Sequence, residues 1–254
     1  MIAPLQTNPK IRTYPNRPGD DAAWDAYVRA HPEGTVFHLP AWNRAVQRAY
    51  GHQPCHLAAW QNGEMVGILP LFFIRSMFVG PVLVSVPYAT YGGILADDEE
   101  IALRLLQHAR ELSEKLGVGY LELRNRQTNC FDLPVIDRYD TFRKRLPDQE
   151  EQVLRSFPKK ARAAARNGLK ALGEDCALVG PDLLSSVYDL YAVTMRRLGS
   201  PNYRKALFVA LQEEFGEDCV CLVVRDHGPP VAGVISFFFR DEIVPYFSGS
   251  LPQG

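Results

Sequence analysis

The chain has 254 residues, few cysteines and almost no net charge. A formal charge of −1 argues against attraction of the whole molecule to DNA, so any anion-binding site has to be local. The five cysteines include no CxxC pair, which argues against a cysteine-based zinc site or a disulfide framework. The sequence therefore predicts reduced thiols in a cytosolic-type compartment. The cysteines are Cys55, Cys130, Cys176, Cys219 and Cys221.

Long apolar runs and familiar catalytic motifs are also missing. The longest apolar stretch, Val66–Ile74, is interrupted by Pro70, whereas a membrane span needs about 20 residues. Residues 1–23 contain four prolines and no apolar core of a secretory signal. GxSxG, HExxH and P-loop patterns do not occur. We therefore expect a cytoplasmic protein without a transmembrane segment or a metal site, and no catalytic residue can be identified from a motif.

Two segments of the chain, Gly63–Phe73 and Gly228–Phe239, resemble each other, with Gly67 aligned to Gly233. Each follows a β-rich run and a polar, glycine-containing turn, which is typical of a hairpin. Upstream, a helical pattern ends in an aromatic residue and a glycine, and downstream lies another β-rich run. The helix ends are Tyr50-Gly51 and Phe215-Gly216, and the downstream runs are Val79–Val86 and Glu242–Ser250. This order predicts an α/β (α+β) fold of two tandem units, each a mixed, mostly antiparallel sheet flanked by helices. Chance similarity is the alternative.

A polar segment, Arg124–Gln152, separates the two repeats, and we expect a loop there with one short strand near Tyr139–Leu146. A boundary near Pro147 gives domains of residues 1–147 and 148–254. The first copy continues after Asp97–Glu100 with an amphipathic helix and a buried strand, for which the second copy has no counterpart. We therefore expect the second domain to be incomplete at its C-terminus, unless that unit is naturally smaller.

The segment Phe157–Gly173 has the sharpest local pattern. Pro158 and Gly173 are typical of a helix start and stop, and no acidic residue lies between Arg155 and Gly173. Like charges at helical spacing repel one another, so the segment is either a solvated helix face or a contact surface for phosphate or nucleic acid. The candidate phosphate-, tRNA- or donor-binding residues are Lys159, Lys160, Arg162, Arg166 and Lys170. The apolar stripe beside them comprises Leu154, Phe157, Ala161, Ala165, Leu169 and Leu172.

Aromatic residues next to glycines follow the third β-rich run of each repeat. Pro87–Gly93 joins a strand to a helix, and Tyr246–Ser250 occupies the equivalent place in the second copy. Glycines free the backbone to line a cleft at a strand end, although turn chemistry and packed tyrosines explain the pattern equally well. The candidate substrate-cleft residues are Tyr88, Tyr91, Gly92, Gly93, Tyr203, Tyr246 and Ser248.

The histidines are expected in structural roles rather than in catalytic or metal-binding sites. His38 lies among Phe37, Leu39 and Trp42, which favours a core or cap role over catalysis. His52 and His56 are four residues apart, but Pro54 prevents them from sharing a helix face that would bind a metal.

Several of these residues together resemble the FemAB-type branch of the GNAT (BioF2-like acetyltransferase) superfamily. The match is nearest to the FemAB-related proteins of exosortase/PEP-CTERM exopolysaccharide systems. It covers nearly the whole chain but rests on diffuse apolar patterns. The segments that carry it are Val36–Trp42, Gly67–Leu71, Lys159–Ala163, Val231–Gly233 and Tyr246–Ser250.

The resemblance implies two GNAT-like units and N-acyl transfer to an amine of a cell-envelope, peptidoglycan or exopolysaccharide precursor. It implies an acyl donor that is aminoacyl-tRNA or acyl-CoA, no tightly bound cofactor, and a place in the cytoplasm or at the inner face of the cytoplasmic membrane. A non-catalytic GNAT-like binding module and an acyl-CoA-dependent N-acetyltransferase are the alternatives. The oligomeric state stays open.

The sequence departs from the coenzyme-A-dependent pattern. No Arg/Gln-x-x-Gly-x-Gly/Ala run is present, and the helix start of the first copy carries Asp97–Glu100. Four carboxylates would repel a diphosphate from the site that a helix N-terminus normally offers, so the first copy is expected to be a poor coenzyme A site.

Overall fold

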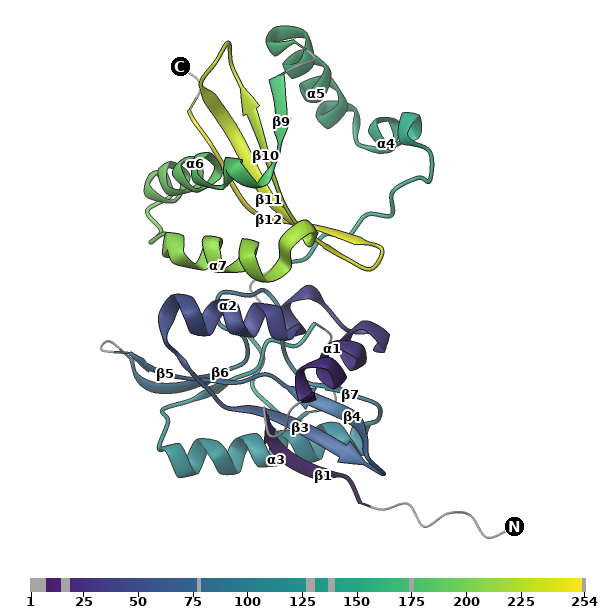
Figure 1. Cartoon of the computed structure of the whole chain (residues 1–254), viewed down its shortest axis with the longest axis vertical. Helices are drawn as coiled ribbons and strands as arrows, with labels where there is room; N and C mark the ends of the chain where they lie inside the picture. Colours follow the sequence, from purple (N-terminus) through teal and green to yellow (C-terminus); the bar gives the residue numbers. More distant parts are fainter. Residues whose placement is uncertain are drawn as a thin grey trace. The chain divides into compact units, whose positions relative to one another are not determined.

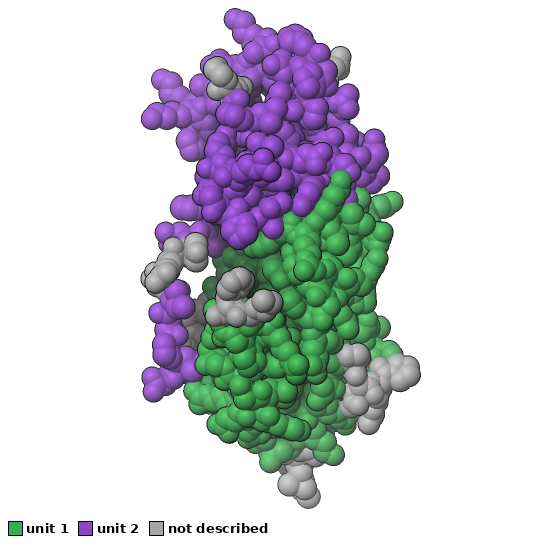
Figure 2. Space-filling view, turned by 90° about the vertical axis from the view of Figure 1, so that its left-hand side faces the viewer, with its two compact units in different colours: residues 1–131, 203–219, 237–244 green, residues 132–202, 220–236, 245–254 purple. Residues whose placement is uncertain are grey.

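The computed structural model describes residues 8–14, 19–76, 79–126, 131–136, 140–173 and 176–252. The chain forms two compact units, each built from several chain segments (Figure 2). Unit 1 comprises residues 1–131, 203–219 and 237–244, and unit 2 comprises residues 132–202, 220–236 and 245–254. These units follow spatial contacts rather than chain order, and the division into domains 1–147 and 148–254 stays a prediction.

The helices and strands are labelled in chain order in Figure 1. The first 131 residues contain β1 (Lys10–Tyr14), α1 (Asp20–Ala30), the 3-10 helix η1 (Val36–His38), α2 (Pro40–Tyr50), β2 (Gln53–Pro54), β3 (His56–Gln61), β4 (Glu64–Leu69), β5 (Phe72–Ser76), β6 (Gly80–Val84), β7 (Leu95–Ala96), α3 (Glu99–Leu116) and β8 (Leu121–Glu122). The remaining residues contain α4 (Glu150–Ser156), α5 (Lys159–Leu172), β9 (Ala177–Val179), η3 (Pro181–Leu183), α6 (Leu184–Arg197), α7 (Lys205–Phe215), η4 (Gly216–Asp218), β10 (Cys219–Arg225), β11 (Pro230–Phe239) and β12 (Glu242–Ser250).

Unit 1 contains two four-stranded sheets, in the orders β1-β3-β4-β7 and β2-β5-β6-β8. All neighbouring strands are antiparallel except β6 and β8, which are parallel and connected through α3. The turn between β3 and β4 has Asn62 and Gly63 at positive φ angles of 53° and 91°, as a two-residue Asn-Gly hairpin requires. The prediction of a mixed, mostly antiparallel sheet is confirmed here.

Helix α3 covers the sheet of unit 1 with the apolar face that the sequence predicts. Ile101, Leu105 and Ala109 are buried against side chains of β3 and β4. Asp98 caps the start of the helix, because its carboxylate accepts a hydrogen bond of 2.8 Å from the Ile101 amide. Gly117 ends it in the left-handed conformation. The helix is therefore fixed at both ends by local sequence and along its length by packing.

Helices α2 and α7 pack against each other within unit 1. Both predicted helix ends are confirmed, since α2 ends at Tyr50 before Gly51 and α7 ends at Phe215 before Gly216. Trp42 of α2 lies edge-on to Phe215 at 6.3 Å between ring centroids and to Phe237 at 5.3 Å. The contact between the two helices therefore has an aromatic core.

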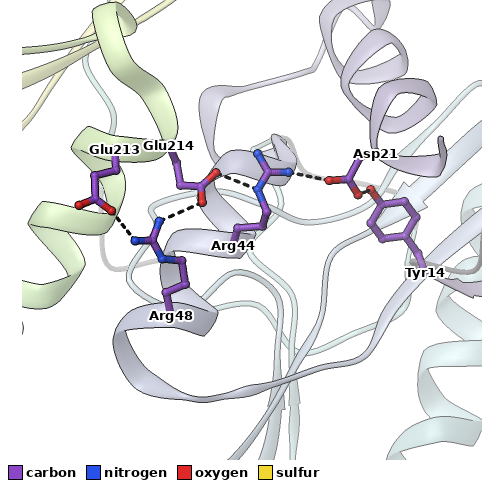
Figure 3. Close-up of polar contacts among 6 residues, drawn as sticks. All are labelled: Tyr14, Asp21, Arg44, Arg48, Glu213 and Glu214. Carbon is purple, nitrogen blue, oxygen red and sulfur yellow. Dashed lines mark hydrogen bonds and ion pairs between the residues drawn. The ribbon is translucent and has the colours of Figure 1, made fainter. Parts of the chain in front are cut away.

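Arginines of α2 pair with glutamates of α7 beside this aromatic core (Figure 3). Glu214 accepts from Arg44 at 2.8 Å and from Arg48 at 3.2 Å, and Glu213 also pairs with Arg48. Arg44 extends the network to Asp21 at 2.6 Å, whose carboxylate also accepts a hydrogen bond from the Tyr14 hydroxyl. Most of these charges are exposed, so the network fixes how the helices align more than it stabilises the fold.

The sheet that contributes to unit 2 has the order β12-β11-β10-β9, and helix α6 packs on it. A Cβ on Gly249 of β12 would stand 2.3 Å from the carbonyl carbon of Leu190 and 2.4 Å from the Tyr191 nitrogen. Only glycine lets a helix backbone approach a strand this closely. The Thr194 hydroxyl is fixed beside it, where it accepts from the Ser250 amide at 2.9 Å and donates to the Ser250 carbonyl at 3.2 Å.

Gly67 and Gly233, which the sequence repeat aligns, lie at corresponding positions of their hairpins. Gly67 lies on the second strand of the β3–β4 hairpin and Gly233 on the second strand of the β10–β11 hairpin. A Cβ on Gly67 would meet Ile101 at 2.8 Å and Leu105 at 3.0 Å; one on Gly233 would meet two aliphatic side chains of α6 at 3.2 and 3.3 Å. The covering helix differs, because α3 follows its hairpin in the chain and α6 precedes its own.

Two further expectations concern the middle of the chain and the membrane. Tyr139 lies outside the described residues, and residues 140–146 contain no strand, so the short strand expected there is wrong over the described part. This stretch is almost entirely exposed and has no neighbouring strand with which to pair. Among the described helices, none has both the length and the apolar character needed to cross a lipid bilayer.

Candidate functional site

The loop after β6 in unit 1 holds two residues in unusual backbone conformations. Val86 and Tyr88 have φ angles of 33° and 64°, which cost free energy for residues with a Cβ. Arg124 maintains this conformation, because its Nη1 donates to the carbonyl oxygens of Ala89 at 2.6 Å and Val86 at 3.4 Å. Such strain at a strand end is common at functional sites, and Tyr88 is half-buried in this loop.

Gly92 and Gly93 are buried in the same loop. Their amides donate to the Arg124 carbonyl at 3.1 and 3.0 Å. A Cβ on Gly92 would lie 2.3 Å from Val86, and one on Gly93 would lie 1.9 Å from the Asn125 amide oxygen. Both glycines are thus required by close packing. Tyr91 is half-buried, with its ring 6.3 Å from that of Phe37. The assignment of these three residues to a substrate cleft stays a prediction.

Tyr88 belongs to a group of rings that we call the aromatic cluster: Tyr50, His52, Tyr88 and Tyr203. Tyr50 stacks on Tyr88 with ring centroids 4.0 Å apart, and His52 lies parallel to both. Tyr203 meets Tyr88 edge-on at 5.1 Å. The structure therefore brings together two residues, Tyr88 and Tyr203, that the sequence proposes separately for one cleft, and all four rings are half-buried.

Arg204 sets the electrostatics of the aromatic cluster. Its amide donates to the Tyr50 hydroxyl at 3.0 Å, and its guanidinium lies over the Tyr50 ring at 5.1 Å. Burial, and then the charge of Arg204, lower the pKa of His52, whereas burial raises the pKa of Tyr88. The Tyr88 hydroxyl and the His52 Nε2 are hydrogen-bonded at 2.8 Å, and the tautomer of His52 determines which of the two donates. A phenol paired with a neutral imidazole can donate one proton and accept another.

Sequence reasoning missed three members of this arrangement: Tyr50, His52 and Arg204. The sequence predicts Tyr50 only as the last residue of a helix, and it considers His52 only as a metal ligand, which Pro54 argues against. Arg204 directly follows the candidate Tyr203, but nothing local indicates that its partner is 154 residues away. The signal that could have found Tyr50 and His52 is their position on either side of Gly51, which turns both rings toward the same side.

Tyr246 and Ser248 lie on β12 in unit 2, where β12 is the edge strand of its sheet. The Leu251 amide donates to the Val231 carbonyl of the neighbouring strand β11, toward the sheet. The Ser250 amide donates to the Thr194 hydroxyl, away from the sheet. Because backbone groups alternate along an antiparallel strand, the N–H group of Ser248, two residues before Ser250, points outward as well. The Ser248 side chain is exposed. The assignment of Tyr246 and Ser248 to a substrate cleft stays a prediction.

The basic helix is confirmed as α5, which runs from Lys159 to Leu172 between Pro158 and Gly173. We call Lys159, Arg162, Arg166 and Lys170 the basic stripe, with Lys160 beside it. No residue of α5 is buried. In the apolar stripe, Leu154 and Leu172 are half-buried and the other four residues are exposed, although the spacing resembles that of a helix packed on a core.

The acidic start of α3 is occupied by structural contacts. Asp98 caps the helix, Asp97 accepts a hydrogen bond of 2.9 Å from the Tyr27 hydroxyl, and Glu100 pairs with Arg104 at 2.8 Å. Of these carboxylates, only that of Asp98 accepts a hydrogen bond from an amide of the first helical turn. That the first copy is a poor diphosphate site stays a prediction.

Buried histidines and cysteines add no metal centre to the described residues. His38 is 2% exposed, its Nδ1 lies 2.8 Å from the Thr35 hydroxyl, and its Nε2 makes no well-formed hydrogen bond although the Gly93 backbone is near. Burial lowers the pKa of His38 to about 3, so the predicted core role is confirmed. Cys55, Cys176, Cys219 and Cys221 are free thiols, and Cys130 lies outside the described residues. Within the described ranges no three His, Cys, Asp or Glu side chains gather as metal ligands would.

Comparison with known proteins connects these features to a superfamily. Residues 155–253, from the end of α4 to β12, match the family described as acetyltransferase (GNAT) domain. No protein of curated function matches the chain in sequence. A crystal structure of FemX matches with a TM-score of 0.60 at 14% sequence identity, over 92% of this chain and 79% of FemX. A GNAT family acetyltransferase of Staphylococcus aureus matches with a TM-score of 0.33 and 13% identity, over 55% of this chain and 100% of that chain.

The family match and the FemX match support different statements. The first identifies a GNAT acetyltransferase domain in the C-terminal part of the chain. The second shows that the whole α/β chain shares the fold of FemX, which confirms the expected fold class. The comparisons therefore support a GNAT acetyltransferase domain over residues 155–253 and the fold of FemX for the chain, whereas membership of the FemAB-type branch and the association with PEP-CTERM systems stay predictions.

Proposed function

We propose that the protein is an N-acyltransferase that moves an acyl or aminoacyl group from an activated donor to an amine. The match of residues 155–253 to a GNAT acetyltransferase domain carries this proposal. In the reaction the amine nitrogen attacks the carbonyl carbon of a thioester or ester, and a C–N bond forms. The C–S or C–O bond breaks, and the leaving thiol or hydroxyl takes up the proton that the amine loses.

The donor carbonyl is proposed to bind at the open edge of β12. The tetrahedral intermediate carries negative charge on its oxygen, and preorganised N–H groups stabilise that charge. The outward-pointing N–H group of Ser248 is such a donor. Helix α6 fixes the strand at Gly249 and Ser250, directly after Ser248, so this N–H group does not have to reorganise during the reaction.

The basic stripe of α5 is proposed to contact phosphate groups of the donor or of its surroundings. Arginine forms bidentate pairs with phosphate, and lysine adds a point charge. Both acyl-CoA and aminoacyl-tRNA carry phosphates, so both remain candidates. Neither requires a tightly bound cofactor.

The aromatic cluster of unit 1 is proposed as the acceptor subsite, together with Tyr91, Gly92 and Gly93. Stacked rings with hydroxyl groups bind sugars and other amphipathic molecules through their faces and edges. Arg204 adds a positive charge that suits a phosphorylated precursor. We therefore propose an amine of a cell-envelope, peptidoglycan or exopolysaccharide precursor as acceptor, met in the cytoplasm or at the inner face of the cytoplasmic membrane.

Two other functions use the same residues. A non-catalytic binding module would keep both subsites and transfer nothing. An acyl-CoA-dependent N-acetyltransferase acting on a small amine would use the donor subsite alone.

The test combines a product assay with two variants of Ser248. The full chain is incubated with acetyl-CoA or with charged tRNA and a panel of amino sugars and envelope precursors, and N-acylated products are measured by mass spectrometry. Ser248→Pro removes the outward N–H, and the open strand edge tolerates proline. Ser248→Ala keeps the N–H. Loss of one such donor is expected to lower kcat by about 10²–10³-fold.

Thermal unfolding of both variants separates catalysis from folding. If both unfold like the parent protein and only Ser248→Pro is inactive, the proposed donor subsite is supported. Equal activity of the two variants would overturn the assignment of the β12 edge. Absence of product with every donor, together with retained binding of a precursor, would favour the binding module.

A further inference from the structure

Helix α5 has an apolar face that is exposed or half-buried in the described chain. Leu169 is 48% exposed, and Phe157, two residues before the helix, is 37% exposed, with the Lys144 ammonium 5.4 Å from the centre of its ring. None of the residues in α4 or α5 is buried. A helix with this apolar spacing normally buries it, so the face is available to something outside the chain.

The order of side chains around α5 separates two surfaces. At 100° per residue, the leucines and all alanines except Ala163 occupy one continuous arc of the helix, bordered by Lys160 on one side and Arg162 on the other. The basic stripe occupies the rest of the circumference together with Ala163 and Asn167, and no acidic residue lies there. Lysine and arginine at the borders can extend their charged ends away from the apolar arc while their stems lie along it.

Three kinds of partner can be compared with these two surfaces. RNA would neutralise the basic stripe but leave the apolar arc in water. A second copy of the chain would bury the arc, but the helix has 14 residues and is about 21 Å long. Its face buries only about 400 Å² in a pair, below the roughly 1,000 Å² of a stable interface. An anionic lipid surface offers phosphates to the basic stripe and acyl chains to the apolar arc.

We propose that α5, with the preceding Phe157, docks the protein on an anionic membrane surface. The inference rests on the proposed function only in taking the basic stripe as an anion-binding surface. Because the apolar arc consists mostly of alanine, with Leu169 and Leu172 as its large side chains, hydrophobic insertion alone is weak. Binding therefore requires acidic lipid headgroups, and the helix lies in the plane of the interface.

The test is co-sedimentation of the full chain with vesicles at 0.15 M salt, without donor or acceptor. One set contains phosphatidylcholine with about a third phosphatidylglycerol, and the other contains phosphatidylcholine alone. We expect binding to the first set only. Arg166→Gln with Lys170→Gln should weaken binding about 25-fold, at about fivefold per charge. Leu169→Gln should weaken it about tenfold.

Matched controls lie at the end of α6 in the same unit. Arg196→Gln with Arg197→Gln removes the same charge from another exposed position, and Leu198→Gln replaces another exposed leucine. Both should bind vesicles like the parent protein. All substituted side chains are exposed, so the variants are expected to fold, which circular dichroism checks.

Two results would overturn the proposal. If the chain does not sediment with acidic vesicles but binds tRNA, and Leu169→Gln leaves that binding unchanged, the basic stripe is an RNA-binding surface. If the α6 controls lose vesicle binding as much as the α5 variants do, the attraction is unspecific. The assay needs no turnover, so failure of the transferase proposal would leave its outcome unaffected.

Discussion

Gly249→Ala should destabilise the protein strongly, because the backbone of α6 occupies the space of the new methyl group. The Cβ would lie 2.3 Å from the carbonyl carbon of Leu190, 2.4 Å from its oxygen and 2.4 Å from the Tyr191 nitrogen. Ordinary contacts of this kind are 3.4–4 Å long. The helix would have to move by about 1 Å, and backbone cannot rotate away as a side chain can.

We expect the free energy of unfolding to fall by about 3 kcal/mol, at the upper end of the cost of overpacking. With a urea dependence of about 2–3 kcal/mol per molar, the midpoint of unfolding should fall by about 1 M. The shift would also move β12, so the N–H group of Ser248 would lose its fixed position. Acyl transfer should therefore decrease even in the fraction that is folded.

Two other glycine-to-alanine substitutions serve as comparisons for Gly249→Ala. Gly233→Ala would meet the methyl groups of Val187 and Leu190 at 3.2 and 3.3 Å, which can adjust, so about 1 kcal/mol is expected. Gly168→Ala places a methyl group in open space on α5 and should stabilise that helix by about 0.5–1 kcal/mol. Urea unfolding followed by circular dichroism measures all three. A Gly249→Ala midpoint equal to that of Gly168→Ala would refute the close approach of α6 to β12.

The remaining predictions concern charged and titrating groups. Burial lowers the pKa of His56 to about 4, so the unfolded chain binds its proton first as the pH falls. The free energy of unfolding should therefore drop between pH 6.5 and pH 4, by about 3 kcal/mol from this residue, and less in His56→Asn, whose oxygen can still accept from the Leu71 amide. Arg204→Gln removes a positive charge next to His52 and should raise the pKa of His52 in an NMR titration; an unchanged value would contradict the contact. Glu214→Gln should lower the unfolding midpoint more than Glu213→Gln, because Glu214 pairs with both arginines of α2, and 1 M salt should reduce the difference.

Local sequence determines the features of this fold that could be predicted. Gly51, Gly117 and Gly216 end helices because each takes a positive φ angle that other residues avoid. Asp98 caps α3 through its own neighbours in sequence. The Asn62-Gly63 turn fixes the first hairpin, and the acid-free run of α5 is visible without any structure. In each case the interacting groups are within a few residues of one another.

Features that depend on distant partners could not be predicted from one sequence. Arg204 meets Tyr50 and Arg48 meets Glu214 across more than 150 residues, and no local pattern identifies such pairs. The exposure of α5 shows the opposite problem. Its apolar spacing is what a buried helix has, and only the tertiary structure shows that none of its residues is fully buried by the described chain.

Gly67 and Gly233 show why the repeat was detectable although the helices around it differ. Each glycine lies where two aliphatic side chains of one helix press on the second strand of a hairpin, and a carbonyl of the neighbouring strand lies 3.3 Å from the absent Cβ. That spacing restricts the residue type whether the covering helix comes from later in the chain, as α3 does, or from earlier, as α6 does. The glycine pattern therefore predicts a hairpin closely covered by a helix, but it does not predict which helix covers it.

The same distinction limits the transfer of function between the copies. Gly249, against α6, leaves the outward N–H groups of β12 at an open edge, whereas β6 of the first copy is paired on both sides, with β5 and β8. The proposed donor subsite is accordingly expected on the second copy.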